Sequence, residues 1–167
     1  MPRSRVLPPG TVLDEGDIAP VFNTLRRLVH SMHAASRETE RRLGVTGAQL
    51  FVLTQLRATP SLSINALAER TMTHQSTVSV VVRRLVRRKL VKKVRAEDDA
   101  RRVELTLTPA GTALLRRAPE VMQVRLARAI ESLQEGDRLA LERGLRHLAT
   151  ELGVADAPVE MFFESVR

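Results

Sequence analysis

The densest group of charged side chains in this sequence lies in residues 83–102, RRLVRRKLVKKVRAEDDARR. The first thirteen of these residues include eight Lys or Arg and no acid, and three acids then stand together at 97–99, just before Arg101 and Arg102. Residues 70–102 hold eleven basic and three acidic side chains, so they account for the entire formal net charge of +8. A positive excess confined to one segment favours a polyanionic partner, either nucleic acid or an anionic membrane.

Residue patterns that carry catalysis are missing from the chain. There is no Cys, which excludes disulfides and thiolate chemistry. There is no Gly-rich phosphate loop, no metalloprotease zinc motif and no nucleophile elbow, so we do not expect an enzyme. Every apolar run is shorter than the roughly 18 residues that span a membrane, and the polar start lacks the apolar centre of a signal peptide. We therefore expect a cytoplasmic protein with no cofactor and no membrane partner.

Apolar periodicity predicts three helices before the basic segment. After a loose arm of residues 1–16, apolar residues recur at helical spacing over 17–43 and predict a long first helix. The sequence TGAQ at 46–49 has the pattern of a capping box and should begin a second helix, which ends before Pro60. Ser63 should cap a short third helix, INALAERT.

The basic segment itself should contain a helix and then a hairpin. A break at Met72–Thr73 precedes a fourth helix over about 74–89, and four apolar residues of this helix should face inward. These are Val78, Val81, Val82 and Leu85. Alternation at period two in residues 91–96 and 102–108 then predicts two strands joined by an acidic tip.

Two further helices are expected towards the C-terminus. Thr108 should cap a helix with Pro109 at its first position, and the apolar stripe of this helix continues to Ile130 with a kink at Pro119. A last helix follows from the leucines spaced helically over 141–152.

Three short helices followed by a hairpin predict a winged helix-turn-helix domain at residues 46–108. The fold class is mainly α with a small β-hairpin wing, flanked by helical dimerisation regions at 17–45 and 109–167. In this architecture the helix after the tight turn enters the major groove of duplex DNA, with its first residues at the base edges. The residues expected on this reading helix are Thr73, His74, Gln75, Ser76, Thr77, Ser79, Arg83 and Arg84. The alternative is that its polar residues form an ordinary solvated first turn.

Basic residues on the outer faces of that helix, at its end and on the wing are expected to contact phosphates, which gives affinity without sequence information. On the helix and its end they are Arg83, Arg84, Arg87, Arg88 and Lys89, and on the wing they are Lys92, Lys93, Arg95 and Arg102. Arg101 suits a narrow A·T-rich minor groove, and Asp99 could hold its guanidinium in place. Glu97 and Asp98 are better explained as turn formers.

These residues resemble a known family. The stretches QSTVSVVVRRLVRRKLV and DARRVELTLTPAG resemble the reading helix and wing of the MarR family of transcriptional regulators, and the resemblance extends over about residues 17–153. The family's wing pattern is present as Asp99, Arg101, Leu107, Thr108 and Gly111. Two positions depart from it, because many relatives have Arg where Val80 stands and Gly where Lys89 stands.

The resemblance implies a homodimer, built from the first and last helices, that binds a pseudo-palindromic operator. It also implies a repressor that a small molecule releases. The dimer has independent support in the sequence, because the apolar stripes of the terminal helices exceed what a small winged core can cover. A second copy of the chain is the simplest partner.

In the family, effectors bind where the dimerisation helices meet the reading domain. His30, His33 and Arg37 are therefore candidates for binding a small anionic aromatic effector. The four residues His30, His33, Glu38 and Glu40, with His147, do not form a tight ligand cluster in the sequence, so no metal site is expected.

Alternatives to this reading remain open. One is a metal-responsive regulator, and another is a winged-helix module that docks on protein and has no effector. RNA binding is less favoured, because the chain has no Trp or Tyr for stacking on bases.

Overall fold

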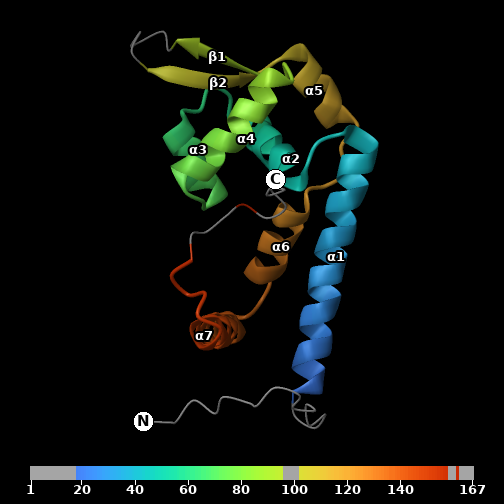
Figure 1. Cartoon of the computed structure of the whole chain (residues 1–167), viewed down its shortest axis with the longest axis vertical. Helices are drawn as coiled ribbons and strands as arrows, with labels where there is room; N and C mark the ends of the chain where they lie inside the picture. The colour runs from blue at the N-terminus through green and yellow to red at the C-terminus, as the bar shows by residue number, and fades with distance from the viewer. Residues whose placement is uncertain (1–17, 96–101, 158–160, 162–167) are drawn as a thin grey trace. The chain divides into compact units, whose positions relative to one another are not determined.

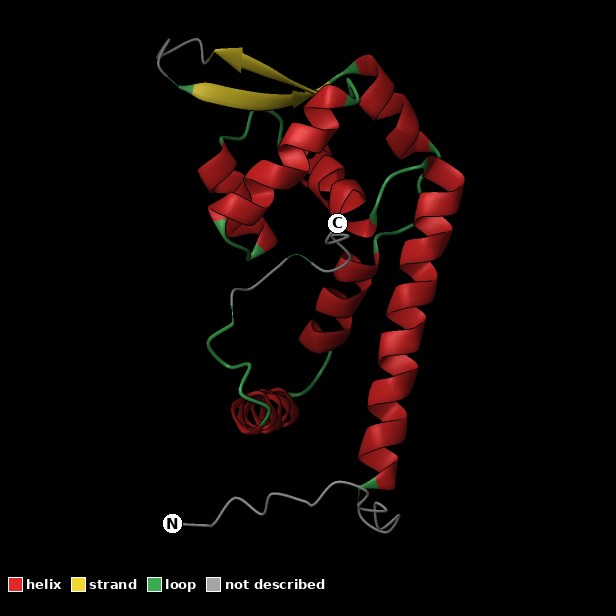
Figure 2. Ribbon diagram, in the orientation of Figure 1, coloured by secondary structure: helices red, strands yellow, loops and turns green. Residues whose placement is uncertain are grey.

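The computed structural model describes residues 18–95, 102–157 and 161 (Figures 1 and 2). Its elements are α1 (Ala19–Leu43), α2 (Gly47–Ala58), α3 (Ile64–Thr71), α4 (Gln75–Arg87), β1 (Val91–Arg95), β2 (Val103–Leu107), α5 (Pro109–Arg116), α6 (Met122–Glu131) and α7 (Glu135–Glu151). The chain forms two compact units, one up to Ala34 and the other from Ala35 onward. The mainly helical fold with a two-stranded hairpin confirms the predicted fold class.

Local side-chain caps begin three of the helices as predicted. The Thr46 hydroxyl accepts a hydrogen bond from the Gln49 amide (3.2 Å), and the Gln49 side chain accepts one from the Thr46 amide (3.3 Å). Ser63 caps α3 by accepting from the Ala66 amide at 3.1 Å. Each cap satisfies an amide that the helix itself cannot, which stabilises the start by about 1 kcal/mol.

The core of the second unit is built around the inward face of α4. Helices α2, α3 and α4 pack on one another, and β1 and β2 pack on α4 and α2. The four apolar residues predicted to point inward from α4 are all buried: Val78, Val81, Val82 and Leu85. They belong to the same buried cluster as Leu50, Leu53 and Leu56 of α2. Burying each such side chain contributes about 1.5–3 kcal/mol to the stability of the domain.

The wing is an antiparallel hairpin that is tied to the loop before α3. Val91 pairs with Leu107 and Arg95 with Val103. Leu62 forms an isolated bridge to β2, in which the Leu105 amide donates to the Leu62 carbonyl at 2.8 Å. Leu105 is fully buried, so the inner part of the wing is anchored to the core.

The structure corrects the prediction of one kinked helix after the wing. Helix α5 ends at Arg116 and α6 begins only at Met122, so Pro119 lies in a break and not in a kink. Proline has no amide hydrogen to continue the helix, and it disfavours helical geometry at the residue before it, Ala118. Val121 is buried and anchors the start of α6 to the core.

Helix α4 ends without glycine. Lys89 has a φ of +57°, the left-handed conformation. Its amide donates to the Val86 carbonyl at 2.9 Å, and the Leu90 amide donates to the Leu85 carbonyl at 3.0 Å. This is the Schellman pattern, so a lysine closes the helix where glycine is the usual residue.

Hydrogen bonds connect the turn from β2 into α5 to the C-terminal end of α4. The Thr108 hydroxyl donates to the Lys89 carbonyl at 2.7 Å and accepts from the Gly111 amide at 3.1 Å. The Thr108 amide donates to the Leu90 carbonyl at 3.1 Å. A Cβ at position 111 would lie only 2.2 Å from the Leu90 carbonyl oxygen, so the Leu107-Thr108-x-x-Gly111 pattern has a steric cause.

Gly111→Ala is therefore expected to lower the free energy of unfolding by about 2 kcal/mol or more, because backbone must move to make room for the methyl group. Gly136→Ala is the matched control, since nothing lies within 4 Å of a Cβ built there. Chemical denaturation followed by circular dichroism measures both. Equal stability of the two variants would contradict the close approach at Gly111.

Candidate nucleic-acid interface

A tight turn sets the position at which α4 begins. Met72 has a φ of +52°, and the Thr73 amide donates to the Ala68 carbonyl at 3.1 Å, which closes α3. The Thr71 and Thr73 hydroxyls lie 2.9 Å apart in a hydrogen bond. The break predicted at Met72–Thr73 is confirmed, and the turn holds α4 in a defined direction relative to α3.

Helix α4 has a buried face and an outward face. Its buried positions alternate with an outward stripe at Ser76, Val80, Arg83 and Arg87, which follow at i, i+4, i+7 and i+11. Val80, at 37% exposure, places an apolar side chain between the polar start and the basic end of this stripe. Because the opposite face is buried, α4 presents this stripe and its exposed first residue, Gln75, to a partner.

The polar residues predicted to read bases differ in exposure. His74, Gln75 and Ser76 are exposed, whereas Thr77 and Ser79 are half-buried. Thr73 is also half-buried, and its hydroxyl is already bonded to Thr71.

The start of α4 also differs from those of its neighbours in the same domain. Its N-cap residue, His74, makes no side-chain cap hydrogen bond, whereas the N-cap residues of α2, α3 and α5 do. Amides at an uncapped helix start are suited to bind a phosphate.

Basic side chains extend the outward stripe onto the wing. Arg83 and Arg87 are exposed on α4, and Lys92, Lys93 and Arg95 are exposed on β1. Arg84 is half-buried. Residues 70–95 contain no Asp or Glu, so these basic side chains lie in a segment without acids. Arg102, just before β2, forms an ion pair with Glu104 of that strand at 3.1 Å.

Two wing residues, Asp99 and Arg101, lie outside the described residues, as does the acidic tip with Glu97 and Asp98. The contact expected between Asp99 and Arg101 therefore stays a prediction.

Arg88 has a different role from the phosphate contact expected of it. Its guanidinium donates to the Gly44 carbonyl and reaches the Gln49 side-chain oxygen at 3.5 Å. The hydrogen bond to Gly44 links the end of α4 to the segment between α1 and α2. These two parts of the chain are far apart in the sequence. Arg88 is therefore a structural tie, although the sequence placed it in the same run as Arg87.

Comparison with known proteins assigns these features to a family. Residues 43–102, from the end of α1 through β1, match a model described as the MarR family. The chain is 29% identical over 116 residues to the HTH-type transcriptional repressor MdtR of Bacillus subtilis (strain 168). The aligned region covers 70% of this chain and 75% of MdtR. It is 30% identical to the BpsR structure of Bordetella bronchiseptica, covering 78% of this chain and 98% of that one, with a TM-score of 0.52. The chain belongs to the MarR family.

Another MarR-family structure, from Bacillus stearothermophilus, is 26% identical, covers 85% of this chain and 99% of its own, and has a TM-score of 0.51. Members of this family are DNA-binding transcriptional regulators and not enzymes. Among the helices that the structure describes, none combines the length and the hydrophobicity of a membrane-spanning segment.

The histidines named as effector or metal candidates are surface residues. His30, His33 and Arg37 are exposed on α1, and His147 is exposed on α7. Within residues 18–95, 102–157 and 161, no three His, Asp or Glu side chains are grouped so that they could hold a metal ion.

One of the carboxylates considered as a metal ligand already has a partner. The Arg41 guanidinium donates to both carboxylate oxygens of Glu38, at 2.9 and 2.7 Å, and this hydrogen bonding holds the pKa of Glu38 below its usual value. The carboxylate is engaged on the surface of α1 and is held as an anion by arginine.

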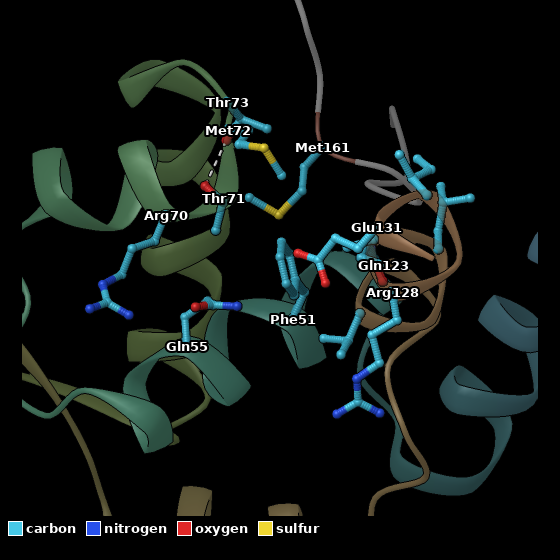
Figure 3. A pocket seen from close by; sticks show the side chains of 14 residues that line it. Phe51, Gln55, Arg70, Thr71, Met72, Thr73, Gln123, Arg128, Glu131 and Met161 are labelled. Carbon is cyan, nitrogen blue, oxygen red and sulfur yellow. Dashed lines mark hydrogen bonds between the residues drawn. The ribbon is translucent and has the colours of Figure 1, made fainter. Parts of the chain in front are cut away.

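A pocket that sequence reasoning missed lies behind the turn before α4 (Figure 3). It has a volume of about 450 Å³ and is lined by α2, the Thr71–Thr73 turn, α6 and Met161. In the sequence, the only feature that could have indicated this pocket is the apolar stripe predicted for the residues of α6. None of His30, His33 and Arg37 lines this pocket.

Neighbouring arginines at the end of α4 provide a test of the tie. Arg88→Ala should lower the free energy of unfolding by about 1 kcal/mol, because the Gly44 carbonyl loses its charged donor. Arg87→Ala, on the exposed stripe, should change it by less than about 0.5 kcal/mol. Urea denaturation distinguishes the two, and an equal effect of both substitutions would show that Arg88 is an ordinary surface residue.

Proposed function

We propose that this MarR-family protein is a homodimeric repressor that binds a pseudo-palindromic duplex operator and is released by a small-molecule effector. The observation that carries the proposal is the division of α4 into a buried apolar face and an outward polar and basic stripe. Exposed basic side chains follow on β1 at Lys92, Lys93 and Arg95, so the exposed charge of α4 and β1 is positive throughout. Such a surface suits the major groove and its flanking phosphates.

Base reading is assigned to the exposed start of α4. Gln75 and Ser76 are exposed and can donate or accept hydrogen bonds at base edges, with Gln suited to adenine. Val80 can offer an apolar contact to a thymine methyl group, which replaces the longer contact that Arg makes in many relatives. Lys93 and Arg95 then contact phosphates, and Arg101 is assigned to the adjoining minor groove, as the wing pattern predicts.

Apolar faces without cover support the dimer. Helix α7 has no buried residue, and large apolar side chains along it are 41–67% exposed: Leu139, Leu141, Leu145, Leu148 and Leu152. The first half of α1 also carries large apolar side chains that are 50–59% exposed: Val21, Phe22, Leu28 and Val29. Apolar surface of this extent is the kind that a second copy of the chain buries.

The pocket behind the Thr71–Thr73 turn supports an effector. In its structure's own description, BpsR has its DNA binding regulated by 6-hydroxynicotinic acid. A family relative that responds to a small molecule and a pocket beside the reading helix together favour the same type of control here.

A protein-docking module is the competing reading of the same surface, and salt dependence separates the two. Bound DNA fragments would first be selected from the source genome. Affinity for the selected operator should then fall with the logarithm of salt concentration at a slope of about −0.9 per neutralised phosphate. A shallow slope together with no preference for any fragment over competitor DNA would contradict the repressor function.

Two substitutions on α4 should act differently on the operator. Arg83→Ala should reduce the salt slope by about 1 and weaken binding on all sequences alike. Gln75→Ala should cost about 1–3 kcal/mol on the preferred sequence and relax the preference at one base pair. Fluorescence anisotropy on matched and mismatched duplexes measures both effects. Unchanged preference in Gln75→Ala would place base reading elsewhere.

The dimer is tested on α7. Leu145→Glu puts a charge on the apolar stripe and should shift sedimentation to the monomer at micromolar concentration, with a loss of operator affinity. Arg143→Glu adds charge on the opposite side of the same helix and should leave the dimer intact. A dimer that survives Leu145→Glu would show that α7 is not part of the interface.

A further inference from the structure

The pocket behind the turn is mostly apolar but contains three charged side chains. Its apolar lining includes Phe51 of α2, Met161, and Val124, Leu126 and Ile130 of α6. Met161 is 4% exposed and belongs to the buried core. The charged residues are Arg70, Arg128 and Glu131.

The two arginines do not direct their charge into the pocket. Arg128 is ion-paired with Glu120, which neutralises it. In Figure 3 the guanidinium groups of Arg70 and Arg128 both point away from the space between α2 and α6. An anionic ligand inside the pocket would therefore find no arginine directed at it.

Glu131 is oriented differently. Figure 3 shows its carboxylate reaching towards the ring of Phe51, with the Gln55 amide directed inward from the opposite wall. Among the described residues no hydrogen bond or ion pair engages this carboxylate. Glu131 is exposed at the last position of α6, so the carboxylate that faces Phe51 lies at the open side of the pocket. The charge directed at the apolar lining is therefore negative, although the whole chain is strongly positive.

We propose that this pocket binds a small aromatic or apolar cation. The cationic group lies between the Glu131 carboxylate and the face of Phe51, because a carboxylate and an aromatic face both attract positive charge. The apolar part of the ligand packs on Met161 and the α6 stripe, since thioethers adapt to ligands of different shapes. This ligand class differs from the anionic aromatic effector expected from His30, His33 and Arg37.

The position of the pocket gives such a ligand a route to the DNA-binding surface. Thr71, Met72 and Thr73 form part of its wall and lead directly into α4. A ligand that fills the space between this turn and α6 contacts the element that sets the direction of the reading helix. Calling the cation the effector rests on the proposed function, whereas its binding does not.

A pair of probes of equal shape and opposite charge tests the ligand class. Tetraphenylphosphonium should bind the full chain in equilibrium dialysis without DNA. Glu131→Gln should weaken it at least about tenfold, equivalent to about 1.4 kcal/mol. Tetraphenylborate binding should not weaken in that variant, because the lost charge repelled it. Ala127→Leu, which fills the pocket, should also reduce phosphonium binding.

Glu40→Gln is the matched control, since Glu40 is an exposed acid outside the pocket. It should bind the phosphonium as the wild type does. The inference is overturned if the phosphonium does not bind, if Glu131→Gln leaves its affinity unchanged, or if Glu40→Gln weakens it equally.

A second measurement separates this inference from the proposed function. Saturating phosphonium should lower the affinity of the wild type for its selected operator, and operator should lower phosphonium affinity by the same factor. Binding that depends on Glu131 but leaves operator affinity unchanged would support the ligand class and overturn the effector role. If the wild-type protein binds no operator even without a ligand, the proposed function is overturned, and the inference about the ligand class is not.

Discussion

The burial of one face of α4 is the constraint on which the rest of this molecule depends. Val78, Val81 and Val82 must leave water, and α2 and α3 provide the surface that covers them. Once that face is buried, Ser76, Val80 and Arg83 have no position except outward. The surface proposed to bind DNA is thus a consequence of core packing, because the two faces belong to one rigid helix.

Both ends of α4 are held by contacts that a surface helix would lack. Its start follows the turn closed by Thr71 and Thr73, and its end is closed by Lys89 in a left-handed conformation. Thr108 bonds the Lys89 carbonyl, which ties the helix end to the exit of the wing. The end of α4 and the exit of the wing are therefore fixed relative to each other, which suits the proposed contact of both elements with one duplex.

The same rigidity makes the pocket suited to control the position of α4. Its wall includes the turn that precedes α4, and its other side is α6, whose start is anchored by Val121. A molecule bound there contacts two elements at once. Its effect on DNA binding depends on how differently it fits the free and DNA-bound arrangements of the turn.

Patterns local in the sequence determined much of this protein. The caps at Thr46 and Ser63, the buried stripe of α4 and the location of the charge could all be predicted, because each depends on residues within about two helical turns. The tertiary structure alone decided that Arg88 bonds Gly44 and that Met161 lies buried beside Phe51. These features join segments far apart in the chain, and periodicity carries no information about which distant side chain will fill a given space.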